Sequence, residues 1–72
     1  MEQHLNFYKI FRVNSDGSIE PIRIVRMGGV QLGPGVRFSK GVSFSGIDLT
    51  FYVGRDFLVE EDGQVLIIKG IF

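Results

Sequence analysis

The sequence predicts an all-β domain of about five strands. Three observations support this fold class. Apolar and polar residues alternate with a period of two over much of the chain, and two Asp-Gly pairs each separate two apolar runs. No long window combines helical spacing with a cap. A short all-β chain of this kind closes into a small barrel, SH3-like or incomplete OB-like, or folds as a compact sandwich.

The chain is short, and its composition limits how it is stabilised. Its 72 residues form one domain, 1–72, of a size that buries only about 60% of its unfolded surface. There is no cysteine and a single histidine, His4, so neither a disulfide nor a structural zinc is expected. Apolar packing, association or both must therefore supply the stability. We expect residues 1–4 to be mobile.

The first predicted hairpin is centred on Asp16-Gly17. The runs on either side are rich in aromatic and β-branched residues, which favour strands. Asp-Gly suits a type I′ turn, because both central residues of that turn need a positive φ. In this register Phe11 lies opposite Ile22, and both faces of the hairpin carry apolar side chains.

The glycine-rich middle of the chain alternates more regularly than a loop does. Its apolar residues stand at even positions up to Phe44 and at odd positions from Ile47 onward. One extra residue in a strand changes the phase in this way, and glycine is common at such a β-bulge. We therefore predict a long bent strand over residues 36–53, kinked by a bulge near Gly46.

Three valines at six-residue intervals allow an alternative fold for this segment. Val30, Val36 and Val42 mimic the hexapeptide repeat of a left-handed β-helix. The next position in the series is Asp48, however, and the flanking segments show no repeat. Stacked coils need several repeats to bury a core, which favours the barrel or the sandwich.

The second predicted hairpin carries Asp62-Gly63 at its tip. Because side chains of a strand alternate between its two faces, the apolar residues of this hairpin divide into two sets. Phe57, Val59, Leu66 and Ile68 form one face, and Leu58, Val65 and Ile67 form the other.

Both faces of this second hairpin are thus apolar. A chain of this length cannot easily cover both of them by itself. We therefore expect one face to be a subunit interface, and a two-fold dimer is the commonest outcome. The predicted interface residues are Leu58, Val65, Ile67, Ile71 and Phe72.

The sequence contains no motif for catalysis or cofactor binding. The glycines at 28–35 lack the spacing and the following helix of a phosphate-binding loop. The acidic run at 60–62 does not have the ligand spacing of a calcium loop. His4 has no cysteine partner, and the serines lie far from it in the sequence. We expect no catalytic, cofactor-binding or metal-ligating residues and no enzymatic activity.

The charged residues are balanced in number but not in position. Residues 1–40 contain six basic and three acidic residues, and residues 41–72 contain two basic and five acidic ones, so the two parts carry +3 and −3. We expect most of these charges to pair internally. The candidate anion-binding surface consists of Arg12, Arg23, Arg37 and Lys40. The alternative function is an SH3-like or OB-like nucleic-acid-binding domain that uses residues 21–47, although the neutral net charge argues against it.

These features favour a small non-enzymatic binding or assembly module without a cofactor. Its expected partner is a second copy of itself, with a dimer favoured, or another protein. No apolar run reaches the length of about 18 residues that a membrane span needs, and the first residues do not resemble a signal peptide. Together with the lack of cysteine, this predicts a cytoplasmic protein with no membrane partner.

Overall fold

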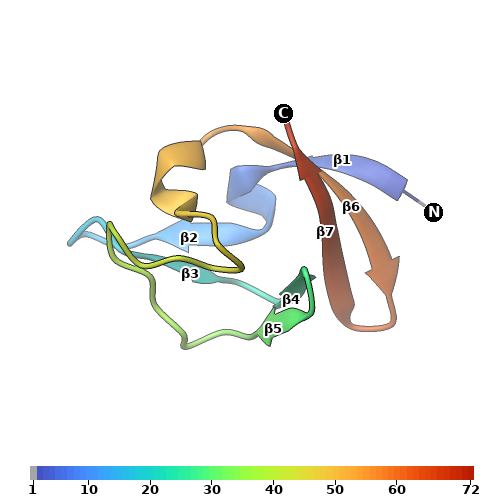
Figure 1. Ribbon diagram of the computed structural model, residues 1–72, viewed down its shortest axis with the longest axis horizontal. Coiled ribbons are helices and arrows are strands. Elements are labelled where there is room, and N and C mark those ends of the chain that lie inside the picture. The colour runs from blue at the N-terminus through green and yellow to red at the C-terminus, as the bar shows by residue number, and fades with distance from the viewer. Residues whose placement is uncertain (1) are drawn as a thin grey trace.

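The protein consists of a five-stranded sheet and a two-stranded sheet that share one core (Figure 1). This computed structural model describes residues 2–72. The larger sheet has the order β1-β6-β7-β4-β5. Its strands are β1 (Glu2–Asn6), β6 (Asp56–Asp62), β7 (Val65–Ile71), β4 (Ile24–Met27) and β5 (Val30–Leu32). The smaller sheet pairs β2 (Phe11–Val13) with β3 (Ile19–Pro21).

The predominance of strands confirms the all-β prediction. Within residues 2–72, the other regular elements are two short 3-10 helices, η1 (Phe7–Lys9) and η2 (Leu49–Tyr52). No helix in this part of the chain is long and apolar enough to cross a membrane. The larger sheet has β1 and β5 at its edges, so its strand pairing does not close it into a barrel.

The core is built around phenylalanine rings from both sheets. Phe57 of β6 and Phe11 of β2 are almost fully buried, and their ring centroids lie 6.0 Å apart. Phe7 of η1 stacks on Phe11 at 5.0 Å. Burying aromatic rings of this size supplies much of the apolar energy that a short chain needs. The rings therefore belong to one core that both sheets share.

The first hairpin forms, but its predicted register is wrong. Phe11 pairs with Pro21 instead of Ile22. The connection is a five-residue loop closed by the Asn14 N–H, which donates to the Ser18 carbonyl at 2.8 Å. The cause is the side chain of Asp16, which accepts a hydrogen bond from the Ser18 N–H at 2.9 Å. Aspartate commonly bonds to the backbone two residues ahead, and here this bond replaces the tight turn.

The second hairpin confirms the predicted division into two faces. The set Phe57, Val59, Leu66 and Ile68 is buried, while Leu58, Val65 and Ile67 are half-buried on the other side. The turn itself lies further along than expected, because Asp62 pairs with Val65 and leaves Gly63 and Gln64 between them. A register change of two residues moves no side chain to the opposite face, so the division is preserved.

The segment 36–53 is not the bent strand that the alternation predicted. It contains no strand and forms only two isolated bridges, one between Phe38 and Ile19 and one between Phe44 and Ile47. Phe38 and Phe44 are buried with their rings 5.6 Å apart, whereas Val36 and Val42 remain 38% and 46% exposed. Glycines with positive φ turn the chain repeatedly here, so an extended strand cannot continue.

The predicted bulge at Gly46 is also wrong, and a tight turn takes its place. Ser45 and Gly46 both have positive φ, 54° and 80°, as the two central residues of a type I′ turn require. Phe44 and Ile47 are paired across this turn. Two paired residues point to the same side, and these two are three positions apart. The turn therefore changes the apolar positions from even to odd without any bulge.

The start of the chain belongs to the larger sheet. Glu2, Gln3 and His4, which we expected to be mobile, pair within β1 with residues of β6. Met1, the remaining residue of that expectation, lies outside the described residues. His4 lies opposite Leu58, and its ring stacks on Phe72 with a centroid distance of 4.6 Å. β1 thereby places an aromatic pair at the margin of the sheet.

Candidate interaction surface

The two faces of the five-stranded sheet have different environments. One face carries the buried residues of β4, β6 and β7, and the smaller sheet and both 3-10 helices lie on that side (Figure 1). The opposite face, which we call the open face, carries four apolar residues that do not belong to the core cluster. They are Ile24, Leu58, Val65 and Ile67, and all four are half-buried among their neighbours on the sheet.

The pairing of strands brings these four residues together. β4 runs parallel to β7, which places Ile24 beside Val65. β6 runs antiparallel to β7 and carries Leu58 on the same face. The open face therefore carries apolar residues on three adjacent strands, and apolar residues grouped on the surface of a small protein often mark an interaction site.

The five predicted interface residues do not all lie on this face. Leu58, Val65 and Ile67 do, and Phe72 lies at its margin through its stacking on His4. Ile71 instead packs against the core cluster from the other side of the sheet. The structure thus brings four of the five residues together and separates one.

Charged side chains form a row across the open face. The strand registers give the order Gln31, Arg26, Ile67, Glu60 and Glu2. Arg26 donates from Nε and Nη2 to Gln31 Oε1, at 3.2 and 2.9 Å. Glu60 Oε1 lies 3.5 Å from Lys69 Nζ. The row is therefore basic on the β4 side of Ile67 and acidic on the β6 and β1 side.

The predicted anion-binding residues do not form one surface. Arg12 and Arg37 meet at Glu20, and the three residues lie in a row because Ile19 is bridged to Phe38 beside the β2–β3 pair. Arg23 is elsewhere, 2.8 Å from Glu61 Oε1. The internal charge pairing that we expected is therefore present for Arg12, Arg23 and Arg37.

Glu20 is the buried centre of its charge cluster. The residue is only 5% exposed, whereas the side chains of Arg12 and Arg37 are 63% and 61% exposed. Glu20 Oε1 lies 3.2 Å from Arg12 and 3.8 Å from Arg37, and it also accepts a hydrogen bond from Asn14 Nδ2 at 3.3 Å. The hydrogen bond from Arg12 is the main reason that the pKa of Glu20 is lowered, and burial partly opposes it. The cluster carries one net positive charge.

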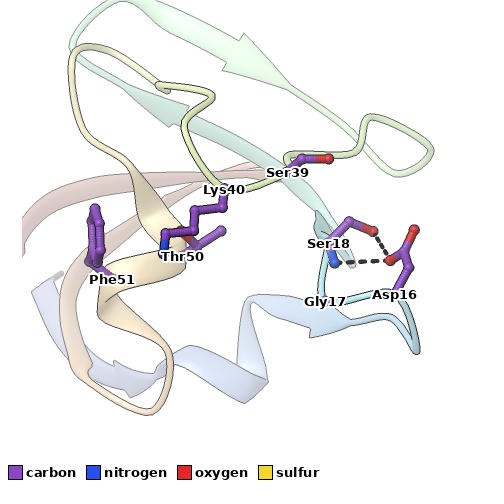
Figure 2. Close-up of a pocket in the computed structure, with 7 residues that line it drawn as sticks. All are labelled: Asp16, Gly17, Ser18, Ser39, Lys40, Thr50 and Phe51. Carbon is purple, nitrogen blue, oxygen red and sulfur yellow. Dashed lines mark hydrogen bonds between the residues drawn. The ribbon is translucent and has the colours of Figure 1, made fainter.

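Lys40 lines a separate surface pocket of about 420 Å³ (Figure 2). The Asp16–Ser18 turn forms one wall, and Thr50 and Phe51 form another. Figure 2 shows the Asp16 carboxylate bonded to Ser18 of its own loop, and Ser18 Oγ donates to it at 2.6 Å. The polar groups of Asp16, Ser18 and Thr50 are therefore hydrogen-bonded within the loops that carry them.

The hydroxyl–carboxylate pairs of this region contain two carboxyl groups with lowered pKa values. Ser18 donates to Asp16, and Thr50 donates to Asp48 at 2.5 Å. These hydrogen bonds lower the pKa of both carboxyl groups, which makes each carboxylate a weaker base. Lys40 adds a smaller lowering of the Asp48 pKa. Residues 2–72 also contain no group of three His, Cys, Asp or Glu side chains placed to hold a metal ion.

Comparison with known proteins adds no assignment to this geometry. No family model, no curated protein and no solved structure matches this chain. The open face is therefore defined by its packing and its charges alone.

Three residues of the open face were not recognised from the sequence. Ile24 and Arg26 join it only because β4 pairs in parallel with β7, a partner about forty residues away, whereas Glu60 lies on the same face of β6 as Leu58. Alternation within a strand gives the face of a residue but not the neighbouring strand. The opposite charges of Arg26 and Glu60 were the one available signal, and their positions on a common row were not derivable.

Proposed function

We propose that this protein is a small non-enzymatic assembly module that forms a homodimer through the open face. The observation that carries the proposal is an apolar surface of Ile24, Leu58, Val65 and Ile67 that no other described element covers. A chain of 72 residues has little apolar surface to spare, so packing a second copy over this face contributes the burial that its own fold lacks.

The charges of the open face support a second copy as the occupant. In a face-to-face dimer with its two-fold axis along β7, the β4 side of one copy covers the β6 side of the other. Arg26 of each copy then lies over Glu60 of its partner, and Ile67 lies on the axis. An interface that repeats the same contact twice needs such a self-complementary arrangement. Aligned packing of two sheets permits this orientation.

The basic stretch supports nucleic-acid binding less well. Arg12 and Arg37 share Glu20, and Arg23 is paired with Glu61. Nucleic-acid affinity comes largely from basic groups that neutralise phosphates, and here these three arginines each have an acidic neighbour that competes with a phosphate. Titration with single-stranded DNA at low salt tests this alternative, and micromolar, salt-sensitive binding would favour it over the assembly module.

The dimer is tested by analytical ultracentrifugation of the wild type and of two matched variants. Ile67→Lys places a charge at the centre of the open face, whereas Val42→Lys makes the same kind of change at an exposed loop residue. We expect a dimer for the wild type and for Val42→Lys at tens of micromolar, and a monomer for Ile67→Lys. Circular dichroism should show the same fold in all three. A folded wild type that remains monomeric at several hundred micromolar would overturn the proposal.

A further inference from the structure

The chain contains two Asp-Gly pairs, Asp16-Gly17 and Asp62-Gly63, each at the turn of a hairpin. In such a pair the main-chain nitrogen of the glycine can attack the carboxyl carbon of the aspartate side chain. Glycine favours this reaction because it has no side chain to shield its nitrogen or to restrict the backbone. All four residues are exposed, so exposure does not distinguish the two pairs. Their hydrogen bonds do distinguish them.

The reacting groups of Asp16-Gly17 are held by hydrogen bonds. The Asp16 carboxylate accepts from the Ser18 N–H at 2.9 Å and from Ser18 Oγ at 2.6 Å (Figure 2). The Gly17 N–H donates to the Asn14 carbonyl at 3.0 Å. Bringing the carboxyl carbon of Asp16 onto the Gly17 nitrogen therefore requires that these bonds break. The bond from Ser18 Oγ is also the main reason that the pKa of Asp16 is lowered, which keeps this carboxyl group ionised.

The corresponding groups of Asp62-Gly63 are not restrained in this way. Within residues 2–72, no hydrogen bond or ion pair holds the Asp62 carboxylate, and the Gly63 N–H donates to no turn or loop carbonyl. The two basic residues that form ion pairs with this hairpin contact its glutamates instead, Arg23 with Glu61 and Lys69 with Glu60. Both the carboxyl group and the nitrogen are therefore available.

The position of the second turn favours local opening. Only Gly63 and Gln64 stand between the paired residues Asp62 and Val65. Gly63 has a φ of 64° whereas Gln64 has no positive φ, as in a type II′ turn. Figure 1 shows that the turn joining β6 and β7 lies at the end of these strands, away from the smaller sheet. Exposed loop tips open more readily than the strands they join, so this tip can bring the two reacting atoms together.

We infer that Asp62-Gly63 is a site of spontaneous isoaspartate formation and that the fold protects Asp16-Gly17 from the same reaction. The Gly63 nitrogen forms a bond to the side-chain carboxyl carbon of Asp62, and its proton leaves with the carboxyl hydroxyl as water. The product is a five-membered cyclic imide. Water then breaks one of the two C–N bonds of the ring: cleavage at the main-chain carbonyl gives isoaspartate, and cleavage at the side-chain carbonyl restores aspartate. One water is released and one is consumed, so no other reactant is needed.

Isoaspartate lengthens the main chain at the end of β6. The chain then runs through the Cβ and Cγ atoms of residue 62, which adds one carbon atom and leaves the α-carboxylate as the side group. Because Asp62 pairs with Val65, this displaces the last pair of the hairpin. The inference goes beyond the assembly function, since the reaction needs only one copy of the chain. Val65 belongs to the open face, however, so the experiment includes the variant Ile67→Lys, in which a dimer cannot shield the turn.

The experiment compares the two pairs after incubation of the folded protein in water enriched in heavy oxygen at mildly acidic pH. Digestion with trypsin in ordinary water then separates peptide 13–23, which contains Asp16-Gly17, from peptide 56–69, which contains Asp62-Gly63. Opening of the imide adds one heavy oxygen atom, and chromatography separates the isoaspartate form. We expect peptide 56–69 to react at least about tenfold faster than peptide 13–23, in the wild type and in Ile67→Lys alike. In guanidinium chloride the two peptides should react at similar rates.

Two matched variants test the role of the glycine. Gly63→Ala should slow the reaction of peptide 56–69 about tenfold, because the methyl group hinders approach to the nitrogen, and Gly17→Ala should leave this peptide unchanged. Both glycines have positive φ, and neither has an atom within 4 Å of an added Cβ. The inference is overturned if peptide 56–69 gains no label in the folded protein, if peptide 13–23 reacts equally fast there, if the difference persists in the unfolded chain, or if Gly63→Ala reacts as the wild type does.

Discussion

Phe44 and Ile47 bond to each other through both of their main-chain groups. The N–H of Phe44 donates to the Ile47 carbonyl at 2.8 Å, and the N–H of Ile47 donates back to Phe44 at 3.0 Å. Only Ser45 and Gly46 stand between them, so this is the smallest hairpin connection that a chain can make. The turn directs Phe44 into the core and starts the path toward η2.

Gly46 is predicted to be required for this turn. Its φ is 80°, and no atom lies within 4 Å of the position that a Cβ would occupy. The cost of Gly46→Val is therefore backbone strain without a clash, about 1–2 kcal/mol of unfolding free energy. Gly46→Asn should cost less, because asparagine tolerates this region. Urea denaturation of the three proteins measures the difference, and equal stability of the valine variant would contradict the turn.

Phe57 is predicted to be the most costly single core residue to truncate. It is fully buried and lies within 6.2 Å of the rings of both Phe7 and Phe11. Phe57→Ala should lower the unfolding free energy by about 3–5 kcal/mol. The matched control is Phe51→Ala, because Phe51 is 67% exposed and its loss should change stability by less than about 0.5 kcal/mol. Similar denaturation midpoints for the two variants would refute this packing.

Glu20 is predicted to make stability depend on pH in the acid range. Its folded-state pKa lies below its ordinary value of 4.5, chiefly because Arg12 donates to the charged carboxylate. The stabilisation is thus fully present above pH 4.5 and is lost as the pH falls through the folded-state pKa. Glu20→Gln should be less stable than the wild type at pH 7 and should lose less stability on acidification.

This pH dependence is measured as thermal midpoints between neutral pH and pH 3. Asp16 and Asp48 also have lowered pKa values, so Glu20→Gln should retain part of the acid sensitivity. A variant whose midpoint falls in parallel with that of the wild type would show that Glu20 does not contribute. The substitution Glu2→Gln at an exposed position serves as control for the removal of one carboxylate.

The orientation of the proposed dimer is predicted to depend on Arg26 and Glu60. Each pair occurs twice in a two-fold interface, so Arg26→Glu or Glu60→Lys alone should weaken the dimer about tenfold. The double exchange restores opposite charges across the interface and should recover most of the affinity. Sedimentation equilibrium of the four proteins gives the coupling energy. Losses that simply add in the double variant would contradict this orientation while leaving the open face as the interface.

The second hairpin was predictable because its signals are local. Alternation assigned Phe57 and Val59 to the core and Leu58 to the opposite face, and the structure agrees. The turn shifted along the chain, but a shift of two residues keeps the side chains from Val59 to Ile68 on their faces. A further register shift between Leu58 and Val59 moves Ile71 to the core side. The face of a residue can therefore be predicted correctly even where its cross-strand partner is predicted wrongly.

The first hairpin and the middle segment show where local signals fail. The Asp16 side chain bonds to Ser18 and widens a loop that Asp-Gly alone predicted to be tight. At Ser45-Gly46 the apolar positions change from even to odd, which fits either a β-bulge or a type I′ turn. Only the pairing of Ile47 with Phe44 distinguishes the two. Both outcomes depend on the path of the residues that follow, and period-two alternation carries no information about that path.

The amino-acid sequence by itself determined that the chain forms strands and which side of its last hairpin is buried. Period-two alternation carries that information, because it arises within each strand. The tertiary structure alone decided which strands are neighbours. The parallel pairing of β4 with β7 brought Ile24 and Arg26 onto the open face. Such contacts join segments far apart in the chain, and their energy depends on the whole packing of the core.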